Sequence, residues 1–204
     1  MRAFSVGLAV VSFVTLGLAS SAGAVPVLFS TTLSGLNESP PNASPGIGTA
    51  LVTFDLAAHT MRVETTFSGL TAGNTAAHIH CCTASPLTGT GGVATTTPTF
   101  TGFPSGLTAG SYDNTFDMSL ASSYNPAFIA GIFDPTHDPA GAELALYNAM
   151  FLGETYLNIH TPNFPSGEIR GFLLPVPEPV TLSLFGAGLA GAIAMCRRKK
   201  AKQA

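Results

Sequence analysis

The chain has 204 residues and a formal net charge of −3 at pH 7. Its charges are unevenly distributed, because residues 25–174 contain ten acidic residues, two arginines and no lysine, a net charge of −8. Such a surface repels phosphate backbones, which excludes a nucleic-acid partner. It suits a well-solvated protein, and it would also attract metal cations. A segment of this length can bury a core without relying on disulfides.

The first 24 residues have the pattern of a signal peptide. Arg2 precedes an apolar stretch from Phe4 to Ala19, which we expect to form a signal helix. The small residues Ala22-Gly23-Ala24 then fit a signal peptidase site, so we predict cleavage before Val25. Residues 1–24 therefore indicate an exported protein.

Short alternating runs broken by glycine and proline fill the next segment and predict strands. Met61, Val63 and Phe67 alternate with polar residues, which is typical of a sheet with one buried and one solvated face. Residues 85–110 indicate mainly a long loop, with a strand at 91–100 as an alternative. We expect strands at residues 27–36, 48–56, 61–70, 75–82, 112–120, 155–160 and 167–173. The last two would form a hairpin.

Two segments favour helices. Residues 126–133 predict a short one, and residues 140–151 a longer one that ends near Gly153. In the longer helix, Leu144, Tyr147 and Phe151 share one stripe, which we expect to face the core. The whole set predicts an all-β domain at residues 25–174: an immunoglobulin-like or Greek-key β-sandwich or barrel with one or two short helices.

Histidines provide the main chemical signal. On a strand, His78 and His80 project from the same face, so their imidazoles can share a metal ion. His160 lies at the end of a second predicted strand and supplies a third imidazole if the two strands are neighbours. This pattern predicts a copper or zinc site formed by His78, His80 and His160. Cys82 shares the same face and is a less favoured ligand.

Simpler interpretations of these residues stay open. The three histidines could instead make hydrogen bonds that fix loops or strand ends, since His-x-His is a short motif. His59 and His137 fall in predicted turns and are expected at the surface. For the adjacent Cys81-Cys82 pair, a vicinal disulfide and free thiols are both compatible with the sequence.

Common catalytic patterns are missing from the sequence. It has no Gly-x-Ser-x-Gly elbow, no His-Glu-x-x-His helix and no glycine-rich phosphate loop. A hydrolase acting on glycans would need two converging carboxylates, and the acidic residues are scattered. Glu168 and Arg170 share a strand face and are expected to form a surface pair. The balance favours a protein that is not an enzyme.

The C-terminal residues 175–204 form a separate tail. A short motif at 176–179 precedes an uncharged run at 180–196 and a basic cluster at 197–202. The run predicts a transmembrane helix, and the cations after it are expected to stay on the cytoplasmic side of the inner membrane. This order of parts resembles the PEP-CTERM sorting signal. The residues that carry the resemblance are Pro177, Glu178, Pro179, Arg197 and Arg198.

The PEP-CTERM resemblance implies a partner and a destination. Its members are processed by an exosortase in Gram-negative bacteria, so the chain would cross the inner membrane and be held there transiently. It would then reach the cell surface or the extracellular matrix. Matrix polysaccharide or another surface protein is the binding partner that this destination implies.

The segment between the two ends resembles a known family in several short motifs. They are Leu33-Ser34-Gly35-Leu36-Asn37-Glu38-Ser39-Pro40-Pro41, Gly48-Thr49-Ala50, Ala77-His78-Ile79-His80, Asn158-Ile159-His160-Thr161 and Phe164-Pro165-Ser166-Gly167-Glu168-Ile169-Arg170-Gly171. Together they resemble the CHRD domain, named after chordin. The resemblance implies a secreted β-rich module with no established catalytic activity. Cys81-Cys82 stands where that family usually has Gly-Pro.

Two functions therefore compete. The first is a non-catalytic binding or structural module in the exopolysaccharide matrix, and the second is a copper or zinc protein, with redox activity as an option.

Overall fold

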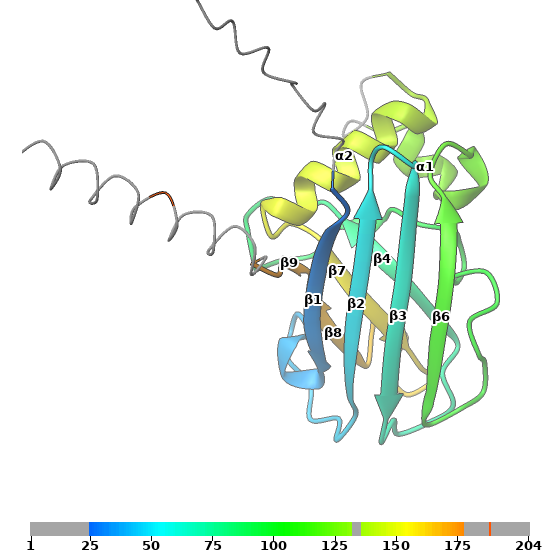
Figure 1. Cartoon of the computed structure of the whole chain (residues 1–204). Coiled ribbons are helices and arrows are strands. Elements are labelled where there is room, and N and C mark those ends of the chain that lie inside the picture. Colours follow the sequence, from blue (N-terminus) through cyan, green and yellow to red (C-terminus); the bar gives the residue numbers. More distant parts are fainter. Residues whose placement is uncertain (1–24, 132–135, 178–187, 189–204) are drawn as a thin grey trace, which may run out of the picture.

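The computed structural model describes residues 25–131, 136–177 and 188 (Figure 1). In these residues the fold is mostly β, as expected, with two α-helices beside the sheet. The strands are β1 (Val27–Ser34), β2 (Ile47–Asp55), β3 (Thr60–Ser68), β4 (Ala76–Cys81), β5 (Gly92–Val93), β6 (Gly110–Asp117), β7 (Tyr156–His160), β8 (Ile169–Phe172) and β9 (Leu174–Pro175). The helices are α1 (Pro126–Ile129) and α2 (Pro139–Phe151).

The strands form one curled antiparallel sheet, a half-barrel. Their order is β5-β4-β7-β8-β1-β2-β3-β6, and β9 also pairs with β1. In Figure 1 the strands β4 and β7 lie behind β1, β2 and β3 and cross them at an angle. The two halves of the sheet meet at β1 and β8, where Ser34 pairs with Arg170. The apolar core fills the space between the halves.

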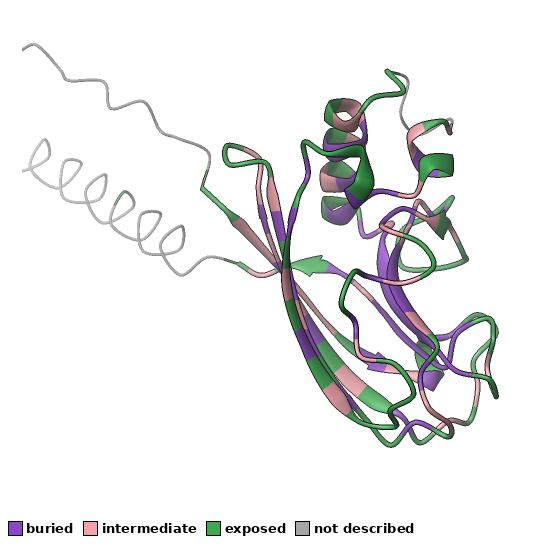
Figure 2. Ribbon diagram, turned by 90° about the vertical axis from the view of Figure 1, so that its right-hand side faces the viewer, coloured by how far each residue is buried: buried purple, intermediate pink, exposed green. Residues whose placement is uncertain are grey.

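The long strands β1, β2, β3 and β6 have one buried and one solvated face, as the alternation predicts. Along β3, Met61, Val63 and Phe67 are buried, whereas Arg62 and Thr66 are exposed. The same alternation is visible along the long strands in Figure 2. Strand β7 differs, because all of its residues are buried. Its second face is covered by loops, and the candidate site lies there.

Residues 85–110 are mainly a loop, as predicted, and the alternative strand at 91–100 is mostly absent for a local reason. Only Gly92–Val93 forms strand β5, and the rest of the segment runs beside the edge of β4 as an irregular cover. Hydroxyls satisfy two of the backbone N–H groups at that edge: Thr95 Oγ1 accepts from Ile79, and Thr99 Oγ1 accepts from Ala77, both at 3.0 Å. Pro98 has no N–H to donate to a ladder.

Helix α2 confirms the longer helix prediction, and its predicted face in part. The Asp138 side chain caps it by accepting from Gly141 N, and Gly153 follows it with a φ of 69°. Of the predicted stripe, Tyr147 and Phe151 pack against the buried ring of Phe29, whereas Leu144 is 52% exposed. Leu146 and Met150, outside the stripe, are fully buried. The helix is apolar on more than one side, so the sequence pattern did not select the face that packs.

Two expected helices lie on residues that are not described. The signal helix falls within residues 1–24, and the predicted transmembrane run falls at 180–196, where only residue 188 is described. Among the residues that the structure does describe, no helix has both the length and the apolar character needed to cross a membrane.

The packing of β7 predicts a large difference between two leucines. Leu157 is fully buried, so Leu157→Ala should lower the free energy of unfolding by about 3 kcal/mol, because it removes apolar contacts and leaves a cavity. Leu144→Ala, on the exposed side of α2, should change it by less than about 0.5 kcal/mol. Urea unfolding at pH 7 measures both, and equal losses would contradict this packing.

Candidate metal site

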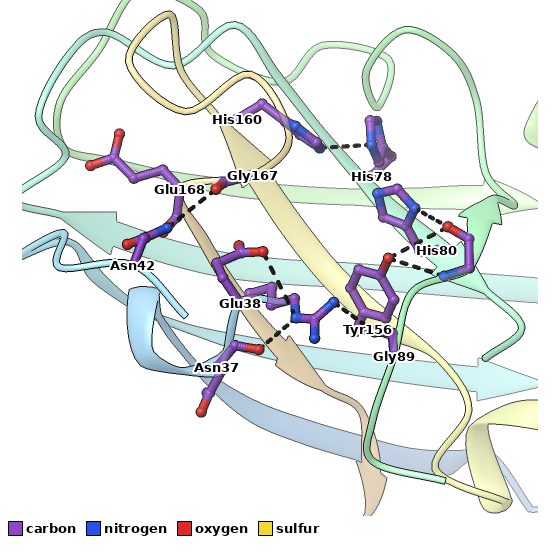
Figure 3. Close-up of polar contacts among 12 residues, drawn as sticks. Asn37, Glu38, Asn42, His78, His80, Gly89, Tyr156, His160, Gly167 and Glu168 are labelled. Carbon is purple, nitrogen blue, oxygen red and sulfur yellow. Dashed lines mark hydrogen bonds and ion pairs between the residues drawn. The ribbon is translucent and has the colours of Figure 1, made fainter. Parts of the chain in front are cut away.

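Three histidines meet on the covered face of β4 and β7. His78 and His80 are two residues apart on β4 and point the same way, as the sequence predicted. The antiparallel pairing places His78 opposite Asn158 and Ala76 opposite His160. His160 is therefore the diagonal neighbour of His78. One ligand nitrogen from each ring lies within 4.8 Å of the others (Figure 3).

Each imidazole is oriented by a backbone carbonyl. His78 Nδ1 lies 3.0 Å from the Pro98 oxygen, His80 Nδ1 lies 2.9 Å from the Gly91 oxygen, and His160 Nδ1 lies 2.9 Å from the Pro165 oxygen. A carbonyl oxygen only accepts hydrogen bonds, so all three Nδ1 atoms must carry the proton. In the neutral rings, all three Nε2 atoms then present lone pairs.

These lone pairs have no donor to satisfy them in the described structure. The Nε2 atoms of His78 and His160 are 2.9 Å apart, a distance at which two unprotonated nitrogens repel each other. His80 Nε2 is buried and has no hydrogen-bond partner. Such an arrangement needs a proton or a metal cation between the rings.

A shared proton is unfavourable because the rings resist charging. Burial, together with the neighbouring His80 and His160, lowers the pKa of His78 to about 3. Burial likewise lowers the pKa of His80 to about 4, and it lowers the pKa of His160. All three imidazoles are therefore neutral near pH 7, which is the form that binds metals.

The histidines open onto a hollow of about 650 Å³. Its remaining lining offers only hydroxyl, backbone and apolar groups, from Thr75, Ala76, Val93, Thr97, Pro98, Thr161, Pro162 and Pro165. An ion held by the three rings would be reachable from this side.

The other candidate residues lie outside the cluster. Cys81 and Cys82 form a disulfide, so Cys82 has no thiolate to offer a metal ion. His59 and His137 are exposed, as expected, although His59 Nδ1 contacts the buried Glu143 carboxylate at 2.7 Å. Of the sorting residues, Pro177 is described and exposed, while Glu178, Pro179, Arg197 and Arg198 lie outside the described residues.

Comparison with known proteins assigns both parts of the chain. The family model of the CHRD domain matches residues 29–173, from β1 to the residue after β8. The chain belongs to the CHRD domain family. A second model, the PEP-CTERM protein-sorting motif, matches residues 175–199. No curated protein and no solved structure matches the chain.

The buried ion pair of this CHRD domain lies behind the histidines. The His80 ring stacks on the Tyr156 ring, with their centres 4.6 Å apart, and the Arg170 guanidinium lies 4.5 Å from the centre of the same Tyr156 ring. Arg170 is 3% exposed and donates to the carbonyl oxygens of Asn37 and Gly89. Its Nε lies 3.8 Å from Glu38 Oε2. Burial raises the pKa of Glu38 to about 7, although the charge of Arg170 acts in the opposite direction.

The expected surface pair of Glu168 and Arg170 is wrong, because both side chains are buried and have different partners. Glu168 is fully buried and accepts hydrogen bonds from Ser44, Thr71 and Thr161. Burial raises the pKa of Glu168, but these hydrogen bonds outweigh it and the net pKa is lowered. Glu168 thus fixes the hairpin that contains Pro165, whose carbonyl orients His160.

Sequence reasoning missed this supporting layer. The available signal was that Arg170 is one of two arginines in residues 25–174 and lies within the residues that match the CHRD domain. Gly171 in that motif is explained by close approach, since a Cβ there would collide with the Thr32 carbonyl of β1.

The two arginines of the domain predict very different effects on stability. Arg170→Met should lower the free energy of unfolding by roughly 3 kcal/mol at pH 8. It leaves the buried Glu38 carboxylate without its ion-pair partner and two carbonyl oxygens without a donor. Arg62→Met removes exposed ion pairs with Asp113 and Glu64, which are screened by solvent, and should leave the free energy of unfolding nearly unchanged. Urea unfolding measures both losses.

The loss of unfolding free energy caused by Arg170→Met should also depend on pH. At pH 5 Glu38, with its pKa of about 7, is protonated and leaves no unpaired charge, so the loss should be smaller than at pH 8. A loss that does not change between the two pH values would contradict the buried pairing of Arg170 with Glu38.

Proposed function

We propose that this protein is an exported module that binds one transition-metal ion, zinc or copper, through His78, His80 and His160. The observation that carries the proposal is the contact between two unprotonated Nε2 atoms, 2.9 Å apart, beside a third Nε2 that has no partner. A metal cation bound by all three nitrogens removes the repulsion and satisfies each lone pair.

The dimensions of the cluster fit such an ion. Zinc–nitrogen bonds of about 2.0–2.1 Å in a tetrahedral site separate the nitrogens by about 3.3 Å. The Nε2 atoms of His78 and His160 are 2.9 Å apart, and one ligand nitrogen of each ring lies within 4.8 Å of the other two, so the cluster is of the size that such an ion needs. Imidazole is a preferred ligand of both zinc and copper. The hydrogen bonds from each Nδ1 to a carbonyl match the second layer that orients metal-bound histidines.

The sorting tail supports a location for this module outside the inner membrane. A PEP-CTERM motif is a sorting signal recognised by an exosortase, and it implies export and membrane-associated processing in Gram-negative bacteria. We infer that the processed protein is held at the cell surface or in the exopolysaccharide matrix. There it would serve as a non-catalytic binding module, in contact with matrix polysaccharide or surface proteins.

Metal analysis tests the site directly. The exported protein, stripped and then incubated with zinc or copper, should retain one equivalent per chain. His78→Ala, His80→Ala and His160→Ala should each weaken binding by more than about 100-fold, because each removes one of three ligands. Elemental analysis after dialysis and competition with a chelator measure content and affinity.

His137→Ala provides the matched control, since His137 is exposed and lies outside the cluster. It should bind as tightly as the wild type. Equal, negligible metal in the wild type and in the three cluster variants would refute the proposal.

Deletion of residues 176–204 tests the sorting function. The shortened protein should lose its surface or matrix location, because it lacks the motif, the uncharged run and the basic cluster. Cell fractionation and immunoblotting compare it with the full chain. A shortened protein found at the normal location would contradict the assignment of the tail.

A further inference from the structure

The candidate metal site has fewer protein ligands than a closed structural site. Among the described residues, the cluster consists of three histidines with no carboxylate or thiolate. Structural zinc sites usually have four protein ligands, whereas sites with three keep a position for water or another molecule. The hollow lined by the histidines, with its threonines, prolines, Ala76 and Val93, supplies no fourth side chain of the usual ligand types.

The charge of the site favours one class of occupant for that position. Three neutral imidazoles leave both charges of a divalent ion uncompensated, and His78 and His160 are almost completely buried. The buried carboxylates nearby are engaged elsewhere, Glu168 with Ser44, Thr71 and Thr161, and Glu38 with Arg170. A buried ion needs compensating charge, and here it must come from outside the protein.

We propose that the metal ion bound by His78, His80 and His160 holds a small monoanion in a fourth position that faces the hollow. The inference rests on the proposed metal binding and extends it to the ligand class: oxygen or nitrogen donors with one negative charge, such as a carboxylate or azide. Water occupies the position when no such anion is present. The site is thus a receptor for anions as well as for a metal.

Ala76 keeps this position open. It lies two residues before His78 on β4, so its side chain projects from the same face, and in the pairing it stands opposite His160. It also lines the hollow and is only partly buried. A larger side chain at residue 76 would enter the space beside the metal without replacing a ligand.

Cobalt(II) provides a visible probe of the fourth position. The exported protein is loaded with cobalt(II), and its visible absorption spectrum is recorded during titration with azide and, separately, with acetate. One equivalent of cobalt(II) should bind, and each anion should change the band positions and intensities in a saturable way. An unchanged spectrum in excess azide, with one equivalent of cobalt bound, would overturn the anion proposal and leave metal binding intact.

Two alanine-to-leucine substitutions test whether the anion binds beside residue 76 or whether any added leucine weakens anion binding. Ala76→Leu should bind the same amount of cobalt and weaken azide binding about tenfold or more, because the leucine crowds the fourth position. Ala58→Leu, in the exposed turn between β2 and β3, should leave both unchanged. Equal azide affinity in all three proteins would refute the assigned position. Failure of the wild type to bind cobalt(II) would instead refute the proposed metal site.

Discussion

The antiparallel pairing of β4 with β7 is the constraint on which the candidate site depends. It brings residues about 80 positions apart into diagonal contact and turns a His-x-His strand into a three-histidine cluster. The pairing alone does not orient the rings. That requires the carbonyls of Pro98, Gly91 and Pro165, which come from loops that cover the outer face of the two strands. These loops also bury the rings, which keeps the imidazoles neutral.

The covering loops are in turn anchored by buried charge. Glu168 joins the hairpin after β7 to Ser44 and Thr71, and Arg170 joins the segment after β1 to the loop at Gly89. Both residues belong to the segment at residues 164–171 that carries the resemblance to the CHRD domain, so in this chain that segment has a clear structural role. Buried charges of this kind cost solvation energy, and they are retained where hydrogen bonds compensate for that cost. Here the compensation holds two loops against the strands that carry the histidines.

Much of the fold could be predicted from local patterns, and the failures have physical causes. The alternation along β3 and the termination of α2 at Gly153 are local properties, and both predictions were confirmed. The face of α2 was wrong at Leu144 because an apolar helix has more than one face that could pack. The alternative strand at residues 91–100 is mostly absent, because threonine hydroxyls of this loop accept the hydrogen bonds from the edge of β4. The prediction that Glu168 and Arg170 are exposed was wrong, because the pattern of residues along a strand does not reveal that loops cover its outer face.

The sequence by itself determined that the chain carries a PEP-CTERM sorting motif, which implies export, that its middle segment is β-rich and acidic, and that His78 and His80 share one face of a strand. These follow from residue order, because signal peptides, sorting tails and side-chain alternation depend on near neighbours in the chain. Only the tertiary structure decided that His160 joins them, that each Nδ1 donates to a carbonyl, and that the Nε2 lone pairs converge beside an open hollow. Those features depend on strand pairing and loop placement between distant segments, which local periodicity does not encode.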